Sequence, residues 1–192
     1  SMVRDADKNL SNYRIPETAA VFQEFVEDMS NWYVRRCRNR FWAKGMEQDK
    51  INAYMTLYTA LVTLAKAAAP MIPFMSEQIY QNLVRTVDAS ATESVHLSDY
   101  PVADEAHIDA ELEKSMDEVL KIVVLGRSAR EASGRKNRQP LSKLYVKAPE
   151  ELGSFYQEII RDELNVKEIE FTDDAERFVN YIFKPQLKTV GP

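Results

Sequence analysis

The chain has 192 residues, of which 45% are hydrophobic, so it is long enough to bury a core of its own. Only 5 residues are glycine, and this composition favours helices over a strand-rich sandwich. The formal net charge of −5 excludes a uniformly basic surface, and no apolar run approaches the roughly 20 residues of a membrane-spanning helix. The single cysteine, Cys37, excludes an intrachain disulfide and a cysteine-based zinc site, so we expect a reducing, cytoplasmic setting.

The first predicted helix runs from about residue 16 to residue 42. Pro16 suits the first turn of a helix, where no backbone N–H donor is needed. Apolar residues then recur at spacings of three and four, which predicts one apolar face: Phe22, Val26, Met29, Tyr33 and Cys37. Gly45 breaks this pattern.

Two further helices are predicted at residues 47–69 and 73–87. Pro70 ends the first of them, because proline lacks the backbone donor and clashes with the preceding turn, and Pro73 can open the second. Residues 94–101 read as an extended segment. A long helix follows at about 108–132, with Gly134 as a left-handed cap. Four helices with short connections predict a mainly α-helical bundle.

In the C-terminal part, apolar and polar residues alternate as in β-strands, which predicts a small α/β appendage. Strand candidates and one helix follow one another at residues 144–148, 150–164 (the helix), 166–171 and 178–183. We therefore predict two domains, a helical one over residues 3–134 and an appendage over residues 135–192.

Basic residues gather in two places of this acidic chain. Residues 31–46 contain five basic residues and no acidic one, and residues 121–143 contain seven basic residues against Glu131 alone. Acidic residues therefore predominate elsewhere. Such segregation places a positive field on a limited surface, which suits a polyanionic partner.

The basic part of the first helix reads Ser30-Asn-Trp-Tyr-Val-Arg-Arg-Cys-Arg-Asn-Arg-Phe-Trp42. At about 100° per residue, Arg35, Arg38 and Trp42 share the face opposite the apolar stripe. Arg36 and Arg40 lie close to that stripe, where each needs a carboxylate or an RNA phosphate as a partner.

These residue types suit single-stranded RNA. Guanidinium groups bind phosphates in a bidentate manner, and an indole ring offers a flat surface to an unpaired base. The alternative is a solvated basic face with Trp32 and Trp42 filling the core. The predicted tRNA-binding residues of this stretch are Arg35, Arg36, Arg38, Arg40, Trp42 and Lys44.

The second basic stretch contains Lys136-Asn-Arg-Gln-Pro-Leu141. Arg130, Lys136 and Arg138 extend the basic surface, and we predict that they hold an RNA backbone. The alternative is a solvated loop between a helix and a strand, with Pro140 shaping the entry into the strand.

Four blocks of the sequence resemble, in the same order, the anticodon-binding region of the isoleucyl-tRNA synthetases of class I. They are Ser30–Trp42, Ala68–Tyr80, Ser94–Pro101 and Ala129–Leu141, the last of which contains a Lys-x-Arg-x-Pro-Leu element. The first and last blocks favour the isoleucine enzymes over their valine and leucine relatives.

This resemblance implies a fragment of a larger enzyme that binds the anticodon arm of isoleucine tRNA, tRNA(Ile). The parent enzyme would activate isoleucine with ATP and Mg²⁺, using catalytic and editing domains elsewhere in its chain. The class uses His-x-Gly-His and Lys-Met-Ser-Lys-Ser elements, and neither occurs here. We therefore expect no catalytic residue, metal or cofactor on this chain, no membrane contact and a monomer.

Two alternatives stay open at this point. One is a fragment of a valyl- or leucyl-tRNA synthetase, which the same blocks resemble less closely. The other is a helical protein-interaction module whose basic patches dock an acidic partner or another part of the same polypeptide.

Overall fold

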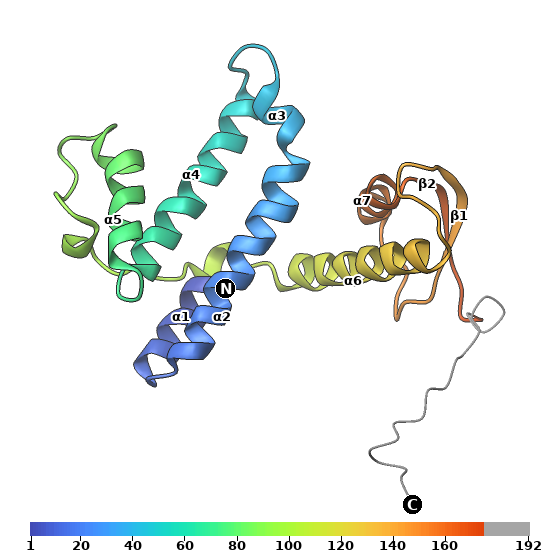
Figure 1. Cartoon of the computed structure of the whole chain (residues 1–192), viewed down its shortest axis with the longest axis horizontal. Coiled ribbons are helices and arrows are strands. Elements are labelled where there is room, and N and C mark those ends of the chain that lie inside the picture. Colours follow the sequence, from blue (N-terminus) through green and yellow to red (C-terminus); the bar gives the residue numbers. More distant parts are fainter. Residues whose placement is uncertain (175–192) are drawn as a thin grey trace, which may run out of the picture. The chain divides into compact units, whose positions relative to one another are not determined.

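The structure is a computed structural model that describes residues 1–174 (Figure 1). The chain forms two compact units, residues 1–108 and residues 109–192, which we call the N-terminal and C-terminal units. The domain boundary predicted after residue 134 differs from this division, because the long helix that precedes it packs inside the C-terminal unit. None of the helices within residues 1–174 is long and apolar enough to cross a membrane.

The N-terminal unit is built from helices. They are α1 (Met2–Ser11), α2 (Ile15–Asp28), a π-helical segment (Met29–Val34), α3 (Arg38–Trp42), α4 (Gln48–Ala68), α5 (Pro73–Tyr80), a second π-helical segment (Gln81–Arg85) and 3-10 turns at Val95–Leu97 and Glu105–His107. Figure 1 shows α2 and α3 running along α4, with α1 against α2 and α5 against the C-terminal end of α4.

Helices α1, α2 and α4 share one core. Its buried members are Ala6, Phe22, Leu64, Ala67 and Ala68. The small alanine side chains let the helix backbones approach closely around the one large ring. Helix α1 was not predicted, although the apolar spacing that begins at Val3 and Ala6 was visible in the sequence.

The first predicted helix is interrupted. Residues 29–34 adopt π-helical geometry, and the backbone departs from a helix at Cys37, where φ is −80° and ψ is 4°. A π-helical turn contains more residues than an α-helical one, so it shifts which side chains face the core. Beyond it, Cys37 and Phe41 are buried against Ala53 of α4, which confirms the apolar placement of Cys37.

An ion pair holds α3 against the start of α4. Arg40 donates from Nε to Asp49 Oδ2 at 2.8 Å and from Nη2 to Asp49 Oδ1 at 2.7 Å. The hydrogen bonds from Arg40 lower the pKa of Asp49, and those to Asp49 and Cys37 raise the pKa of Arg40. This confirms that Arg40 requires an anionic partner, and its partner here is a carboxylate.

A carboxylate that accepts several hydrogen bonds also fixes the segment after the second π-helical turn. Glu77 of α5 accepts hydrogen bonds from Ser94 Oγ and from the backbone N–H of Val95, each at 2.8 Å. Burial alone would raise the pKa of Glu77, but these bonds and one from Gln81 outweigh it and lower the pKa. The segment predicted to be extended is therefore a 3-10 turn with Val95 buried.

The C-terminal unit joins one long helix to a β-α-β motif. Its elements are α6 (Ala110–Ala132), β1 (Leu141–Val146), α7 (Ser154–Leu164) and β2 (Val166–Phe171). Strands β1 and β2 pair in parallel, with Leu141 opposite Val166 and Val146 opposite Phe171. Helix α7 connects them and packs on α6.

This motif confirms the predicted α/β appendage, with shifted boundaries. Strand β1 begins before residue 144, and α7 begins only after Gly153, because Pro149 and the following residues form a loop. Gly134 has a φ of 68°, as expected of a left-handed cap. The strand candidate at residues 178–183 lies outside the described residues.

Gly126 permits the close approach of α6 and α7. A Cβ atom at this position would collide with the side chain of Leu164, which is almost completely buried and has little room to move. We expect Gly126→Val to lower the free energy of unfolding of the C-terminal unit by about 1–3 kcal/mol, as overpacking does. Urea denaturation measures this. Leu125→Val on the exposed side of α6 is the control, and an equal loss there would contradict the packing argument.

The Arg40–Asp49 pair makes stability depend on pH. Because folding lowers the pKa of Asp49 below its ordinary 3.8, the pair contributes stability above about pH 4 and loses it as the pH falls through the folded value. Asp49→Asn should therefore destabilise the chain at pH 7, with the difference from wild type shrinking towards about pH 2. Urea denaturation at several pH values tests this, and Asp99→Asn, an exposed carboxylate of the same unit, is the control.

Candidate nucleic-acid interface

The first predicted site extends from the residues just before α3, through α3, into the loop that leads to α4. We call its exposed members the tip cluster: Arg35, Arg36, Arg38, Trp42 and Lys44. The ring of Phe41 packs on that of Tyr54, with centroids 5.1 Å apart, and anchors α3. The next side chain, Trp42, consequently points away from the core and is 72% exposed, so the alternative that it fills the core is wrong.

Two arginines of the tip cluster lie over tryptophan rings. The guanidinium carbon of Arg38 lies 4.2 Å from the centroid of the Trp42 ring, one helical turn away. Arg35 lies 5.7 Å from the ring of Trp32 and donates from Nε to the carbonyl of Asn31 at 2.7 Å. Two arginines of this region are therefore held near an aromatic ring.

The cations of this region differ in their partners. Arg40 is held by Asp49, as described above, and belongs to the support of the surface. Within residues 1–174, no carboxylate contacts Arg38 or Lys44, and both side chains are exposed. These two residues can bind an external anion without breaking an ion pair.

Arg130 of the second predicted site has a structural role. Its side chain is only 6% exposed, and it donates to the backbone carbonyls of Leu164 (3.0 Å), Lys136 (2.6 Å) and Gln139. This guanidinium group is enclosed by the fold: both Nη atoms donate to backbone carbonyls, while Nε is buried without a hydrogen-bond partner among the described residues. We therefore correct the prediction and remove Arg130 from the residues that contact RNA.

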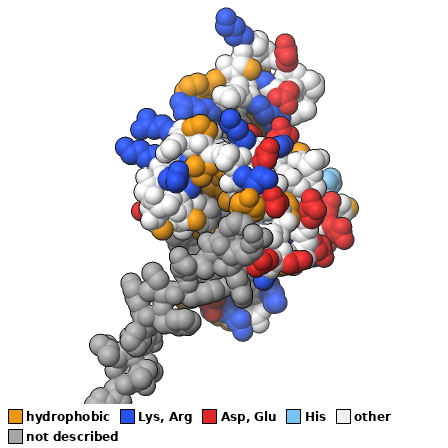
Figure 2. All heavy atoms as spheres, turned by 90° about the vertical axis from the view of Figure 1, so that its right-hand side faces the viewer, with side chains coloured by type: hydrophobic (Ala, Val, Ile, Leu, Met, Phe, Trp, Pro, Cys, Tyr) orange, Lys and Arg blue, Asp and Glu red, His pale blue; other side chains and the backbone are white. Residues whose placement is uncertain are grey.

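Lys136 and Arg138, by contrast, are exposed on the loop between α6 and β1. Figure 2 shows a face of the molecule on which Lys and Arg side chains are interspersed with hydrophobic and acidic ones. Part of the second basic stretch is neutralised within its own unit: Arg127 pairs with the buried Glu163 at 2.6 Å, and Lys143 pairs with Glu170 at 2.8 Å. The loop cations remain as candidates for an external anion.

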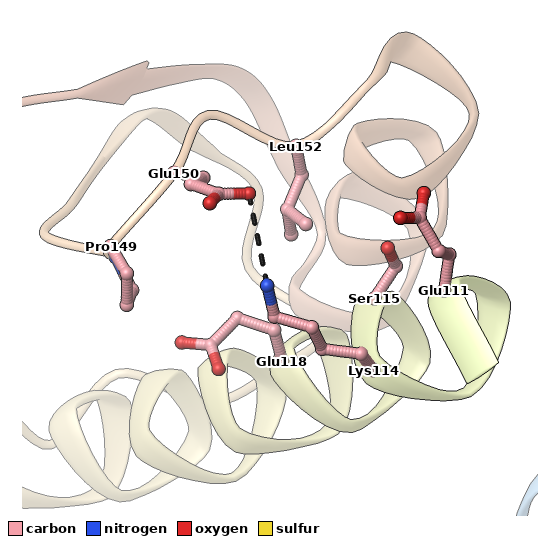
Figure 3. Close-up of a pocket in the computed structure, with 7 residues that line it drawn as sticks. All are labelled: Glu111, Lys114, Ser115, Glu118, Pro149, Glu150 and Leu152. Carbon is pink, nitrogen blue, oxygen red and sulfur yellow. Dashed lines mark ion pairs between the residues drawn. The ribbon is translucent and has the colours of Figure 1, made fainter.

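A hollow elsewhere in the C-terminal unit has the wrong charge for nucleic acid (Figure 3). It lies between α6 and the loop before α7, and its charged lining consists of Glu111, Glu118, Glu150 and Lys114. Lys114 and Glu150 approach to 4.0 Å, and both are well exposed. Three carboxylates around one ammonium group would repel a phosphate, so this hollow is not part of the candidate interface.

Two partners of the interface were missed in the sequence. Asp49, which anchors Arg40, follows Gly45 by only a few residues and is a first-turn acid of the next helix. Asn165 lies between α7 and β2 with a φ of 49° and donates to the carbonyls of Asn137 and Arg138. An asparagine between a helix and a strand is a signal for such a left-handed position, so it was recognisable.

Comparison with known proteins shows the family to which the chain is similar. Residues 1–147 match the family model described as the anticodon-binding domain of tRNA ligase. The chain is 48% identical over 191 residues to isoleucine–tRNA ligase from Clostridium novyi and 49% identical over 191 residues to that from Clostridium acetobutylicum. It is also 45% identical over 196 residues to isoleucine–tRNA ligase from Thermus thermophilus.

These matches cover nearly the whole of this chain but only a small part of each relative. They cover 100% of this chain in the two Clostridium proteins and 99% in the Thermus protein, but only 18% and 19% of the relatives' own lengths. The family match contains the tip cluster together with Lys136 and Arg138. The chain therefore belongs to the family of anticodon-binding domains of tRNA ligases, and it spans about 18% of the length of the isoleucine–tRNA ligases that it matches.

Proposed function

We propose that this chain binds the anticodon arm of tRNA(Ile) as one part of a longer isoleucine–tRNA ligase. The observation that carries the proposal is the exposed Trp42 ring beside Arg38, on a chain of the anticodon-binding family. The parent would activate isoleucine with ATP and Mg²⁺ and transfer it to the tRNA in domains outside this chain. The proposal includes a monomeric protein in the cytoplasm.

The chemistry of the tip cluster suits unpaired anticodon bases. A cation–aromatic contact at an exposed site contributes about 0.5–1 kcal/mol, whereas stacking a base on an aromatic ring contributes about 1–3 kcal/mol. A base can therefore replace Arg38 on the Trp42 ring with a net gain. The displaced guanidinium group is then close to the phosphate of the same nucleotide and can bind it.

The remaining exposed cations would hold the RNA backbone. Arg35, Arg36 and Lys44 contribute from the N-terminal unit, and Lys136 and Arg138 contribute from the C-terminal unit. Phosphate contacts of this kind fix the position of the RNA but carry no sequence information. Reading of the anticodon is therefore assigned to the surface around Trp42.

An anticodon exchange tests the proposal. We expect the chain to bind a tRNA(Ile) transcript more tightly than the same transcript with a methionine anticodon, because the surface around Trp42 contacts the anticodon bases. Only those unpaired bases differ between the two transcripts. Filter binding at low salt measures both affinities. Equal affinities would contradict anticodon recognition and would instead support a surface that docks acidic partners, while tighter binding of a valine or leucine tRNA would reassign the parent enzyme.

Removing the aromatic surface tests the residue assignment. Trp42→Ala should weaken binding of the tRNA(Ile) transcript by about 5- to 150-fold, which corresponds to the loss of about 1–3 kcal/mol of base stacking. Phe74→Ala is the matched control, because Phe74 is an aromatic residue of the same unit that is 91% exposed. In a Trp32→Phe background, Trp42 is the only tryptophan, and the transcript should quench its fluorescence; unchanged emission would remove Trp42 from the interface.

A further inference from the structure

The loop between α6 and β1 turns its backbone carbonyls towards the protein. Four successive carbonyls, those of Lys136, Asn137, Arg138 and Gln139, all accept hydrogen bonds from residues of the C-terminal unit. A loop usually leaves several of its carbonyls to water. Here the backbone carbonyls are used internally, while the side chains of Lys136 and Arg138 stay exposed.

Arg130 supplies the first set of donors. From the last turn of α6, its Nη2 atom reaches the carbonyls of Lys136 and Gln139, and its Nη1 atom reaches the carbonyl of Leu164 at the end of α7. No carboxylate neutralises this buried group within the described residues. The carbonyl ends of two helices carry partial negative charge, which explains how the cation is tolerated.

Asn165 supplies the second set. Its Nδ2 atom donates to the carbonyl of Asn137 at 3.2 Å and to that of Arg138 at 3.1 Å. In the opposite direction, Asn137 Nδ2 donates to the carbonyl of Glu163 at 3.1 Å. The left-handed backbone of Asn165 aims its amide at the loop, so the end of α7 and the loop hold each other in one conformation.

This arrangement determines where the loop cations point. Arg135, Lys136 and Arg138 are exposed, and we call these three residues the cationic ridge. A hollow of about 480 Å³ lies beside the ridge and is lined by Arg127, Arg135, Lys136 and Asn137 and by the largely buried Arg130. Glu131 is the only acidic residue of its lining.

Burial of Arg130 makes the conformation of the loop a condition of folding. A buried guanidinium group without acceptors is very costly, because its lost hydration must be replaced by hydrogen bonds. The inward-facing carbonyls of the loop provide the acceptors for Nη2, and the carbonyl of Leu164 provides the one for Nη1. The hydrogen bonds from Arg130 therefore hold the loop in place. Its exposed cations are ordered before any ligand binds.

We propose that the cationic ridge binds the sugar-phosphate backbone of RNA and that Arg130 and Asn165 are positioning residues that hold it in its binding conformation. This inference rests on the proposed function for the identity of the RNA. It deepens that function, because the phosphate contacts of Lys136 and Arg138, which are indifferent to the anticodon, then depend on Arg130 and Asn165. Because the ridge is already ordered in the free protein, binding of RNA costs less conformational entropy.

The test combines ridge and positioning variants in the 192-residue chain. The ridge pair is Lys136→Ala with Arg138→Ala, and the positioning variant is Asn165→Gly, which keeps the left-handed backbone while removing both donors. Arg130→Lys is a second positioning variant that keeps the charge but loses the planar set of donors. Lys114→Ala with Lys147→Ala, two exposed cations of the same unit, is the charge-matched control.

The readout is the slope of log K against log salt for tRNA(Ile) transcripts with the native and the exchanged anticodon. The ridge pair should reduce the slope by about 1.4, which is about 0.7 for each lost single-strand phosphate contact, with both transcripts. In the Asn165→Gly or Arg130→Lys background, the same pair should reduce it by less than half as much. The control pair should change it little.

Each outcome decides something different. A full reduction by the ridge pair in the positioning backgrounds would overturn the role of Arg130 and Asn165. An unchanged slope in the ridge pair alone would overturn the ridge as a binding surface. If the ridge pair weakens both transcripts equally and the wild type does not distinguish anticodons, the inference stands and anticodon recognition fails. If no RNA binds at low salt, both fail.

Discussion

A guanidinium group must find acceptors or water, and this constraint organises the whole molecule. Arg40 finds the carboxylate of Asp49, which fixes α3 on α4. Arg130 finds three carbonyls and fixes the loop before β1. Arg38 instead lies over the exposed ring of Trp42. Arg40 and Arg130, whose acceptors lie within the protein, thus support the two surfaces, and the exposed cations on those surfaces can meet a ligand.

This division explains how an acidic chain can serve a polyanion. Much of the positive charge of the second basic stretch is neutralised inside the C-terminal unit, as in the pair of Arg127 with Glu163. The cations that stay exposed act over short range, because salt screens exposed charges within about 8 Å at physiological ionic strength. The net charge of −5 therefore repels RNA weakly at a distance but does not oppose contact at the tip cluster or the cationic ridge.

Periodicity in the sequence predicted the helices well, because burial of an apolar stripe is a local pattern. It located α4 and α6 to within a few residues and identified Trp42 and Arg38 as neighbours. It did not reveal that Arg130 is buried, since its acceptor on Leu164 is 34 residues away and no local pattern encodes it. The π-helical interruption at Met29–Val34 was not predicted either.

The number of available cations limits what either surface can do alone. The tip cluster and the cationic ridge each offer only a few phosphate contacts, and contacts of this kind are weakened by salt. Covalent connection changes this limit, since binding of one surface raises the effective concentration of RNA at the other. The affinity for RNA therefore depends on the tip cluster and the cationic ridge being part of one chain, in addition to the charge of each.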